Sequence, residues 1–230
     1  MTKMLALVVA CAATASAHAD MIAYWNFNTL TTATNNGTTY AADQGLGQLL
    51  LNVPSTDQAG SNRGINSFGG TTVNGLTGEV NGQALSVQGS SLDSGSTTAV
   101  LNNGSTLTFS FSMTSFEDLI LSFASQRTST GFNSNIVSWS IDGANFTDLG
   151  PAYTPNTTFA TTGVLTFDFS SIAALDNAAT AYVRITLNGA TNIGGNNRFD
   201  NIQLNATLVP TPGAAALMGL GLLAFRRRTR

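Results

Sequence analysis

At residues 107–113 the chain carries the run Leu107-Thr108-Phe109-Ser110-Phe111-Ser112-Met113, in which large apolar side chains alternate with hydroxyl side chains. A period of two predicts a β-strand with one buried face, because successive side chains of a strand point to opposite sides. The same alternation recurs in five later segments bounded by Gly, Asn, Asp or Ser: 118–124, 136–141, 164–169, 181–187 and 199–208. Short strands at this spacing predict two antiparallel sheets packed face to face.

The alternation also predicts which side chains point inward. The strand at 136–141 should bury Trp139 and Ile141, and the last strand should bury Leu208. Residues 142–143, Asp-Gly, are typical of a tight turn and predict a hairpin that returns at 145–146.

The first hundred residues have a weaker pattern. Residues 22–27 and 84–87 predict short strands, 48–53 is a candidate strand, and the rest of 28–82 has the Gly, Asn and Thr content of loops. Residues 171–176 are expected to form one helical turn, and no segment shows a sustained helical period. The sequence therefore predicts an all-β fold over residues 20–208, an antiparallel β-sandwich of jelly-roll type.

Composition excludes most catalytic chemistry from this region. The single Cys, the single His and the single Lys all precede residue 20, at Cys11, His18 and Lys3. Disulfides, Cys nucleophiles, His general bases, Ser–Lys mechanisms and His- or Cys-ligated zinc are therefore excluded from residues 20–208. Four arginines against twelve Asp and Glu give the same region a formal charge of −8. An acidic chain without a basic patch disfavours nucleic acid as a partner.

The N-terminus has the pattern of a secretory signal peptide. Lys3 precedes an apolar run over residues 4–13, and Ala17-His18-Ala19 precedes Asp20. A basic start, a short apolar stretch and an Ala-x-Ala site predict a signal peptide over residues 1–19, cleaved between Ala19 and Asp20. We therefore expect the protein to be exported.

The C-terminal segment, residues 209–230, has three parts in order. It begins with Val209-Pro210-Thr211-Pro212-Gly213, continues with an uncharged apolar run to Phe225, and ends with four arginines, Arg226, Arg227, Arg228 and Arg230. As a helix, residues 213–225 would cover about 20 Å, less than a hydrocarbon core of about 30 Å. The arginines would stay on the cytoplasmic side. This predicts a short helix that holds the protein transiently in the inner membrane, or else an ordinary single-pass tail anchor.

The order of these three parts resembles the PEP-CTERM sorting signal of Gram-negative bacteria. The resemblance covers about twenty residues and departs from the Val-Pro-Glu-Pro pattern at Thr211. It implies that an exosortase, a membrane transpeptidase, cleaves near residues 209–213 and passes the protein to the cell surface or the extracellular matrix.

The central region resembles jelly-roll modules of bacterial secreted proteins, a strand plan shared by many carbohydrate-binding modules. Residues 138–146 and 197–204 carry this resemblance, and Tyr24-Trp25-Asn26-Phe27 is similar to the opening of concanavalin-like lectin domains. These likenesses concern the fold, and a fold does not fix a function.

Four residues are candidates for contacting a glycan: Tyr153, Arg127, Asn133 and Trp139. Aromatic rings and Asn or Arg side chains are suited to sugar rings and hydroxyl groups. Trp139 also lies on an apolar face, where packing in the core is the competing interpretation. Tyr153, between Pro151 and Pro155, is expected to be more exposed.

Asp200, at the start of the last strand, is the candidate ligand for a structural calcium ion, because the resembling modules often have a carboxylate there and calcium takes oxygen ligands. The competing interpretation is an aspartate that accepts hydrogen bonds from turn amides. The two glutamates, Glu79 and Glu117, lack an evident second carboxylate of the kind that glycoside hydrolysis requires. No catalytic residue is assigned, and no cofactor other than calcium is expected.

Three functions follow, in order of preference. The first is a non-enzymatic, surface-sorted β-sandwich of the envelope or extracellular polysaccharide matrix. The second is a carbohydrate-binding module that recognises matrix or environmental glycans. The third is a glycan hydrolase based on carboxylates.

Overall fold

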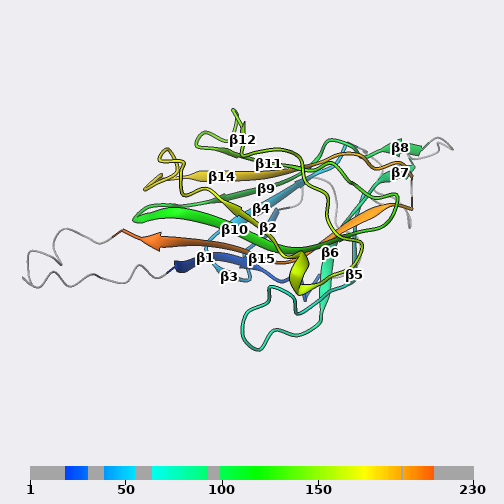
Figure 1. Ribbon diagram of the computed structural model, residues 1–230, viewed down its shortest axis with the longest axis horizontal. Helices are drawn as coiled ribbons and strands as arrows, with labels where there is room; N and C mark the ends of the chain where they lie inside the picture. The colour runs from blue at the N-terminus through cyan, green and yellow to red at the C-terminus, as the bar shows by residue number, and fades with distance from the viewer. Residues whose placement is uncertain (1–18, 31–38, 55–63, 93–98, 193, 210–230) are drawn as a thin grey trace, which may run out of the picture.

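The computed structural model describes residues 19–30, 39–54, 64–92, 99–192 and 194–209. These residues form two antiparallel sheets with a short separate hairpin (Figure 1). The larger sheet, sheet A, contains β1 (Ala19–Trp25), β3 (Gln44–Gly45), β5 (Ile65–Gly69), β6 (Gln83–Gln88), β10 (Phe116–Arg127), β13 (Leu165–Asp168) and β15 (Asn196–Leu208). Sheet B contains β2 (Thr39–Ala41), β4 (Gln48–Asn52), β9 (Ser105–Phe111), β11 (Ile136–Ser140), β12 (Thr147–Asp148) and β14 (Ala181–Leu187). The hairpin is β7 (Ser90–Leu92) with β8 (Ala99–Leu101), and η1 (Thr161–Gly163) is a single 3₁₀ turn.

The two sheets share one hydrophobic core. Strand β9 shows the alternation most clearly: Leu107, Phe109 and Phe111 are buried, while Thr108 and Ser110 are half-buried on the outer side. Trp25 of sheet A packs on Phe109 of sheet B with ring centroids 5.1 Å apart, so the sheets meet directly through aromatic side chains. The predicted antiparallel β-sandwich is therefore confirmed at the level of sheets and core.

Strand β15 organises sheet A. It pairs with β10 along one edge. Along its other edge, the N-terminal part pairs with β6 and the C-terminal part with β1. The two neighbours meet end to end, and Asp200 and Asn201 lie at the junction between the Phe199–Leu85 pair and the Ile202–Trp25 pair. Asn201 has a positive φ of 49°, which marks the same break in the strand.

Several local predictions were wrong. Ile141 is 54% exposed because β11 already ends at Ser140, and Leu208 is 51% exposed because it is the last residue of β15. Residues 171–176 form successive turns instead of a helical turn. The hairpin after β11 returns at β12, later than residues 145–146, because the Asp142 carboxylate accepts the N–H groups of its own turn.

The predicted long loop over residues 62–82 contains strand β5, which pairs with β6. Residues 70–82, the connection between β5 and β6, form a loop that hangs below sheet A in Figure 1. Among the described residues no helix is long and apolar enough to span a membrane. The expected signal peptide up to residue 18 and the sorting tail from residue 210 onward lie outside the described residues, whereas Ala19 and Asp20 begin β1.

Candidate functional site

The outer face of sheet B carries a row of side chains around Arg184. Arg184 on β14 lies opposite Thr108 on β9 and Ser138 on β11, and Ser138 lies opposite Asp148 on β12. Beyond Thr108 the row continues to Leu50, which is 40% exposed. Neighbouring rows add amides and hydroxyls: Gln48, Asn52, Thr106, Ser110, Tyr182 and Thr186. The face is thus polar and almost uncharged.

Arg184 is held in place by two contacts. Its guanidinium carbon lies 3.5 Å from the centroid of the Phe146 ring, and its Nε donates a hydrogen bond to Thr108 Oγ1 at 3.1 Å. Among the described residues it forms no ion pair. Partial burial lowers the pKa of Arg184 from its usual value. A guanidinium stays protonated in proteins, so this side chain presents its remaining N–H groups as a fixed cationic fork.

The turn that follows β11 positions Phe146. The Asp142 carboxylate accepts hydrogen bonds from the backbone N–H groups of Ala144 and Asn145 and from the Asn145 side chain, at 2.7–2.9 Å. Ser140 Oγ also donates to it at 2.8 Å. These bonds, the Asn145 side chain first, hold the pKa of Asp142 well below its usual range. The aromatic ring over Arg184 is therefore carried by a hydrogen-bonded turn.

A hollow of about 320 Å³ opens beside Arg184. It is lined by Asn52, Val53, Pro54, Gly104, Thr106 and Arg184. The lining of the hollow therefore combines a guanidinium, an amide and a hydroxyl with small apolar groups. Such a lining suits an oxygen-rich ligand that has both polar edges and apolar faces.

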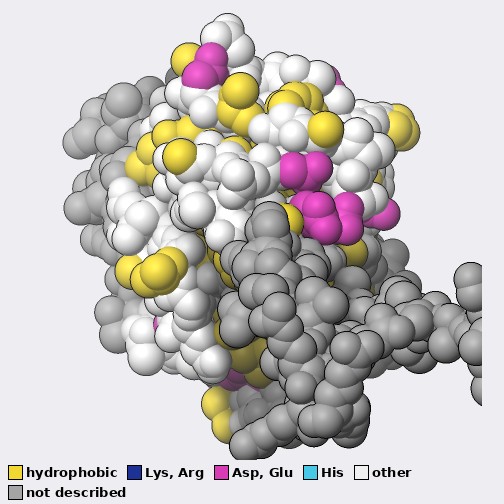
Figure 2. All heavy atoms as spheres, turned by 90° about the vertical axis from the view of Figure 1, so that its left-hand side faces the viewer, with side chains coloured by type: hydrophobic (Ala, Val, Ile, Leu, Met, Phe, Trp, Pro, Cys, Tyr) yellow, Lys and Arg dark blue, Asp and Glu magenta, His cyan; other side chains and the backbone are white. Residues whose placement is uncertain are grey.

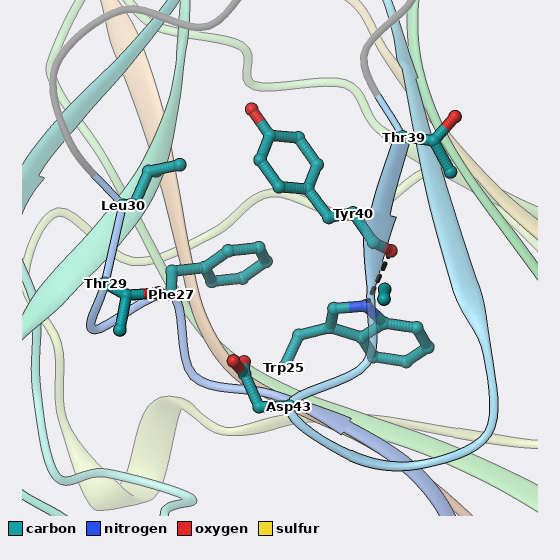
Figure 3. A pocket seen from close by; sticks show the side chains of 8 residues that line it. Trp25, Phe27, Thr29, Leu30, Thr39, Tyr40 and Asp43 are labelled. Atoms are coloured by element: carbon teal, nitrogen blue, oxygen red, sulfur yellow. Dashed lines mark hydrogen bonds between the residues drawn. The ribbon is translucent and has the colours of Figure 1, made fainter.

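A second hollow, of about 370 Å³, lies at one edge of the sandwich (Figure 3). The Trp25 indole N–H donates to the carbonyl oxygen of Tyr40 at 3.3 Å, and the rings of Phe27 and Tyr40 meet edge to face at 6.4 Å. Asp43 also lines this hollow. Trp25 and Phe27 are buried, and the segment that joins Leu30 to Thr39 lies outside the described residues.

The strand junction in β15 forms a buried polar cluster with the loop 70–82. Asp200 accepts hydrogen bonds from the backbone N–H groups of Thr71 at 2.7 Å and Asn201 at 2.9 Å. The Asn201 side-chain amide donates to the carbonyl oxygens of Thr71 at 2.7 Å and Val73 at 2.9 Å. The loop is thus fixed to sheet A through two adjacent side chains.

Glu79 anchors the far end of the same loop. Its carboxylate lies 2.6 Å from the Tyr24 hydroxyl and accepts a hydrogen bond from the Asn28 amide at 2.6 Å, with longer bonds from Asn26. The Tyr24 hydroxyl also lies 2.6 Å from Asn201 Oδ1, so a single proton faces two acceptors.

Burial and hydrogen bonding together set the pKa values of this cluster. Burial raises the pKa of Asp200 to about 7, against the opposing hydrogen bonds from Thr71 and Asn201 and with a further increase from Glu79. Burial, followed by Glu79, raises the pKa of Tyr24 above its usual range. For Glu79, burial is outweighed by hydrogen bonds from Tyr24, Asn28 and Asn26, and its pKa falls below the ordinary value. Asp200 is therefore a buried carboxylate that forms no ion pair with a described residue.

No protein-family model matches the chain, and no curated protein matches it. Solved structures similar to it include the xylan-binding CBM22-1 domain of Paenibacillus barcinonensis Xyn10C, at 11% identity over 85% of this chain and 100% of that chain, with a TM-score of 0.41. The K3 cleaved adhesin domain of Lys-gingipain from Porphyromonas gingivalis has 14% identity, 82% and 99% coverage and a TM-score of 0.42. A Bacteroides vulgatus protein named as a candidate glycoside hydrolase has 10% identity, 82% and 100% coverage and a TM-score of 0.47.

These likenesses concern the arrangement of strands. At such identities and TM-scores they carry no argument about ligand or activity, which has to come from the side chains of this chain.

The four residues predicted to contact a glycan do not line one surface. Trp139 is half-buried and packs against the core from the inner face of β11, which is the competing interpretation of its position. The Tyr153 ring also packs inward, with centroids 5.2 Å from Phe167 and 6.3 Å from Phe123. Burial raises the pKa of Tyr153 above its usual range.

Arg127 and Asn133 have structural contacts near the end of β10 and the start of β11. Arg127 Nη1 donates to the carbonyl oxygens of Thr128 and Ser129 at 3.1 and 3.3 Å. The Asn133 carbonyl oxygen accepts a hydrogen bond from the Thr154 hydroxyl. Both residues thus fix their neighbouring loops, and neither lines the hollow beside Arg184.

The residues around that hollow were missed in the sequence. The alternation in 181–187 already places Arg184 on the outward face between Tyr182 and Thr186. Nothing in the sequence, however, brings Asn52 and Phe146 to the same face.

Figure 2 shows another side of the molecule, where acidic side chains gather and the described atoms carry no Lys or Arg colour. Among the described residues no group of three or more Asp, Glu, His or Cys side chains is close enough to hold a metal ion.

Proposed function

We propose that this protein is an exported, non-catalytic β-sandwich that binds a glycan on the outer face of sheet B. The observation that carries the proposal is the guanidinium of Arg184, fixed between Phe146 and Thr108 at the side of a hollow that it shares with Asn52 and Thr106. A guanidinium donates to sugar hydroxyls or carboxylates, an amide both donates and accepts, and apolar groups cover the C–H face of a sugar ring.

Binding without catalysis is supported by the placement of the carboxylates. Glycoside hydrolysis uses two carboxyl groups on opposite sides of the scissile bond. Glu79 and Asp200 instead accept hydrogen bonds from Tyr24, Asn28, Thr71 and Asn201, which fix the loop 70–82. We therefore regard glycan hydrolysis as a less favoured function than glycan binding.

Export and surface sorting complete the proposal. The predicted signal peptide supports export, and the resemblance of residues 209–230 to PEP-CTERM signals supports release at the cell surface or into the extracellular polysaccharide matrix. An exosortase-type transpeptidase is then the processing partner. If the sheet B face binds no glycan, the remaining function is a structural or adhesive one in the same location.

The decisive test is retardation of the exported protein in gels that contain soluble polysaccharides. We expect one or more neutral or acidic polysaccharides to slow the protein. Arg184→Gln should weaken binding at this face about 10- to 100-fold, because a hydrogen bond from a charged donor contributes about 1.5–3 kcal/mol. Asn52→Ala should weaken it less.

Arg127→Gln is the matched control, because it removes an arginine whose contacts lie elsewhere. No retardation across a broad panel would exclude glycan binding, and equal retardation of Arg184→Gln would exclude this face.

We also propose a structural calcium ion at the strand junction, as the resemblance implied for Asp200. Turning the Asn201 amide by 180° would let its Nδ2 donate to the Tyr24 hydroxyl, which could then donate to Glu79. The same turn would direct Oδ1 toward the carbonyl oxygens of Thr71 and Val73, which Nδ2 now contacts. Oxygens gathered beside a buried carboxylate are ligands that calcium prefers. Asp200, Asn201, Thr71 and Val73 would hold the ion.

A further inference from the structure

A second arginine lies on an aromatic ring on the outer face of sheet A. The guanidinium carbon of Arg198 on β15 lies 4.4 Å from the centroid of the Phe68 ring on β5. The register explains the contact: Arg198 lies opposite Ser86 on β6, Ser86 lies opposite Asn66 on β5, and Phe68 is two residues along the same face. On the other side Arg198 lies opposite Gln126 on β10.

This row repeats the chemistry of the sheet B row. Asn66 and Gln126 supply half-buried amides on either side of Arg198, much as Asn52 and Thr106 supply an amide and a hydroxyl beside Arg184. Ser86, which lies between Arg198 and Asn66, is fully buried, and the Gln126 amide oxygen accepts the backbone N–H of Phe159 at 3.1 Å. The ring and the guanidinium are both half-buried.

Arg198 has no ionic partner among the described residues. Its Nε is buried there without a hydrogen-bond partner. Asp200, the next residue on the same face, directs its two oxygens to the N–H groups of Thr71 and Asn201. Partial burial lowers the pKa of Arg198 from its usual value, as it does for Arg184. Among the described residues, neither Arg184 nor Arg198 therefore pairs with a carboxylate, although residues 20–208 contain twelve Asp and Glu.

We propose that Arg198 and Phe68, with Asn66, form a second polysaccharide-binding site, so that one molecule bridges two glycan chains. Arg184 and Arg198 lie on the outer faces of opposite sheets, with the shared core between them. A single chain therefore cannot pass over both in one straight segment. The ligand class is an oxygen-rich polysaccharide with hydroxyl or isolated carboxylate acceptors. A densely charged polyanion fits poorly, because residues 20–208 carry a formal charge of −8.

The inference rests on the proposed glycan binding, and the test separates the two. The probes are a soluble polysaccharide that retards the exported protein and a short oligosaccharide cut from it. Titration calorimetry should give two oligosaccharides per protein chain, and one per chain for Arg184→Gln and for Arg198→Gln. Light scattering of the polysaccharide should rise with the wild-type protein and stay low with either variant, while each variant is still retarded in the gel.

Asn66→Ala is a second variant that leaves the Arg198–Phe68 contact in place, and it should weaken only one of the two sites. Thermal unfolding of each variant controls for folding. One oligosaccharide per chain in the wild type, or an Arg198→Gln protein that scatters as the wild type does, would overturn the bridging proposal and leave the sheet B site standing. A wild type that binds no polysaccharide at all would overturn both.

Discussion

Asn201 is the residue on which the loop 70–82 depends most directly. Its backbone adopts a positive φ at the strand junction, and its side chain contacts Thr71, Val73 and the Tyr24 hydroxyl. In one orientation of the amide, Nδ2 donates hydrogen bonds to the carbonyl oxygens of Thr71 and Val73. In the other orientation Oδ1 faces these two carbonyl oxygens, and a bound cation would offset the repulsion among the three oxygens. Protonation or a bound cation would each relieve the buried Asp200 carboxylate next to it. The orientation of the Asn201 amide therefore decides whether its own N–H groups or a bound cation contact these carbonyl oxygens.

At this scale the prediction concerns calcium. Calcium that binds the folded chain alone should raise its melting temperature relative to a chelator, by roughly 5–10 °C at calcium about 100-fold above the dissociation constant. Asp200→Asn should abolish the rise. Asp142→Asn, which changes an exposed carboxylate in another turn, should keep it. Identical melting curves in calcium and in chelator would show that the Asn201 amide holds the loop without an ion.

At the scale of elements, short edge strands close the sandwich by contacts that tolerate little change. β3 pairs with β1 through Ala23–Gly45 and Tyr24–Gln44. Gly45 has a φ of 76°, and a Cβ atom there would lie 2.1 Å from the backbone oxygen of Ile22. Only glycine adopts this conformation and this close approach without strain.

Gly45→Ala should therefore destabilise the protein by about 2 kcal/mol or more, from the left-handed backbone and from the displacement of β1. Gly69→Ala is the matched control, because Gly69 lies on another strand where an added Cβ atom would meet nothing within 4 Å. Chemical denaturation of both variants measures the difference. If Gly45→Ala unfolds at the same denaturant midpoint as the control, the close contact between β3 and β1 does not contribute to the free energy of unfolding.

At the scale of the whole molecule, the two outer faces of the sandwich are separate from the two chain ends. The faces present arginine–aromatic pairs on opposite sides of one core. The described chain begins at Ala19 in β1, which is antiparallel to β15, so both ends leave the sandwich at the same end (Figure 1). A tail processed at residues 209–213 would leave both faces free, because Val209 immediately follows the end of β15.

The prediction at this scale is the intact mass of the protein recovered from the cell surface. We expect a chain that begins at Asp20 and ends within residues 209–213. Replacing Pro210 and Pro212 by Ala should leave a membrane-held form that keeps its arginines. A surface form that still ends at Arg230 would show a plain membrane anchor, and the resemblance to PEP-CTERM signals would then have been misleading.

Much of the fold was predictable because alternation is a local property. The buried Leu107, Phe109 and Phe111, and the outward Arg184, follow from a period of two within single strands. The missed strand β5 and the exposed Ile141 depend instead on where the hydrogen-bonded pairing between two strands begins and ends. The sequence of one strand does not specify this without its partner.

The sequence alone determined the sandwich, the absence of Cys, His and Lys chemistry after residue 19, and the inward and outward positions within strands such as 107–111 and 181–187, since these depend on composition and on spacing within a strand. Only the tertiary structure brought Phe146 to Arg184, Phe68 to Arg198 and the loop 70–82 to Asp200. Those contacts join residues from different strands and loops. Their partners are set by strand order and register, which arise when the two sheets bury a common core.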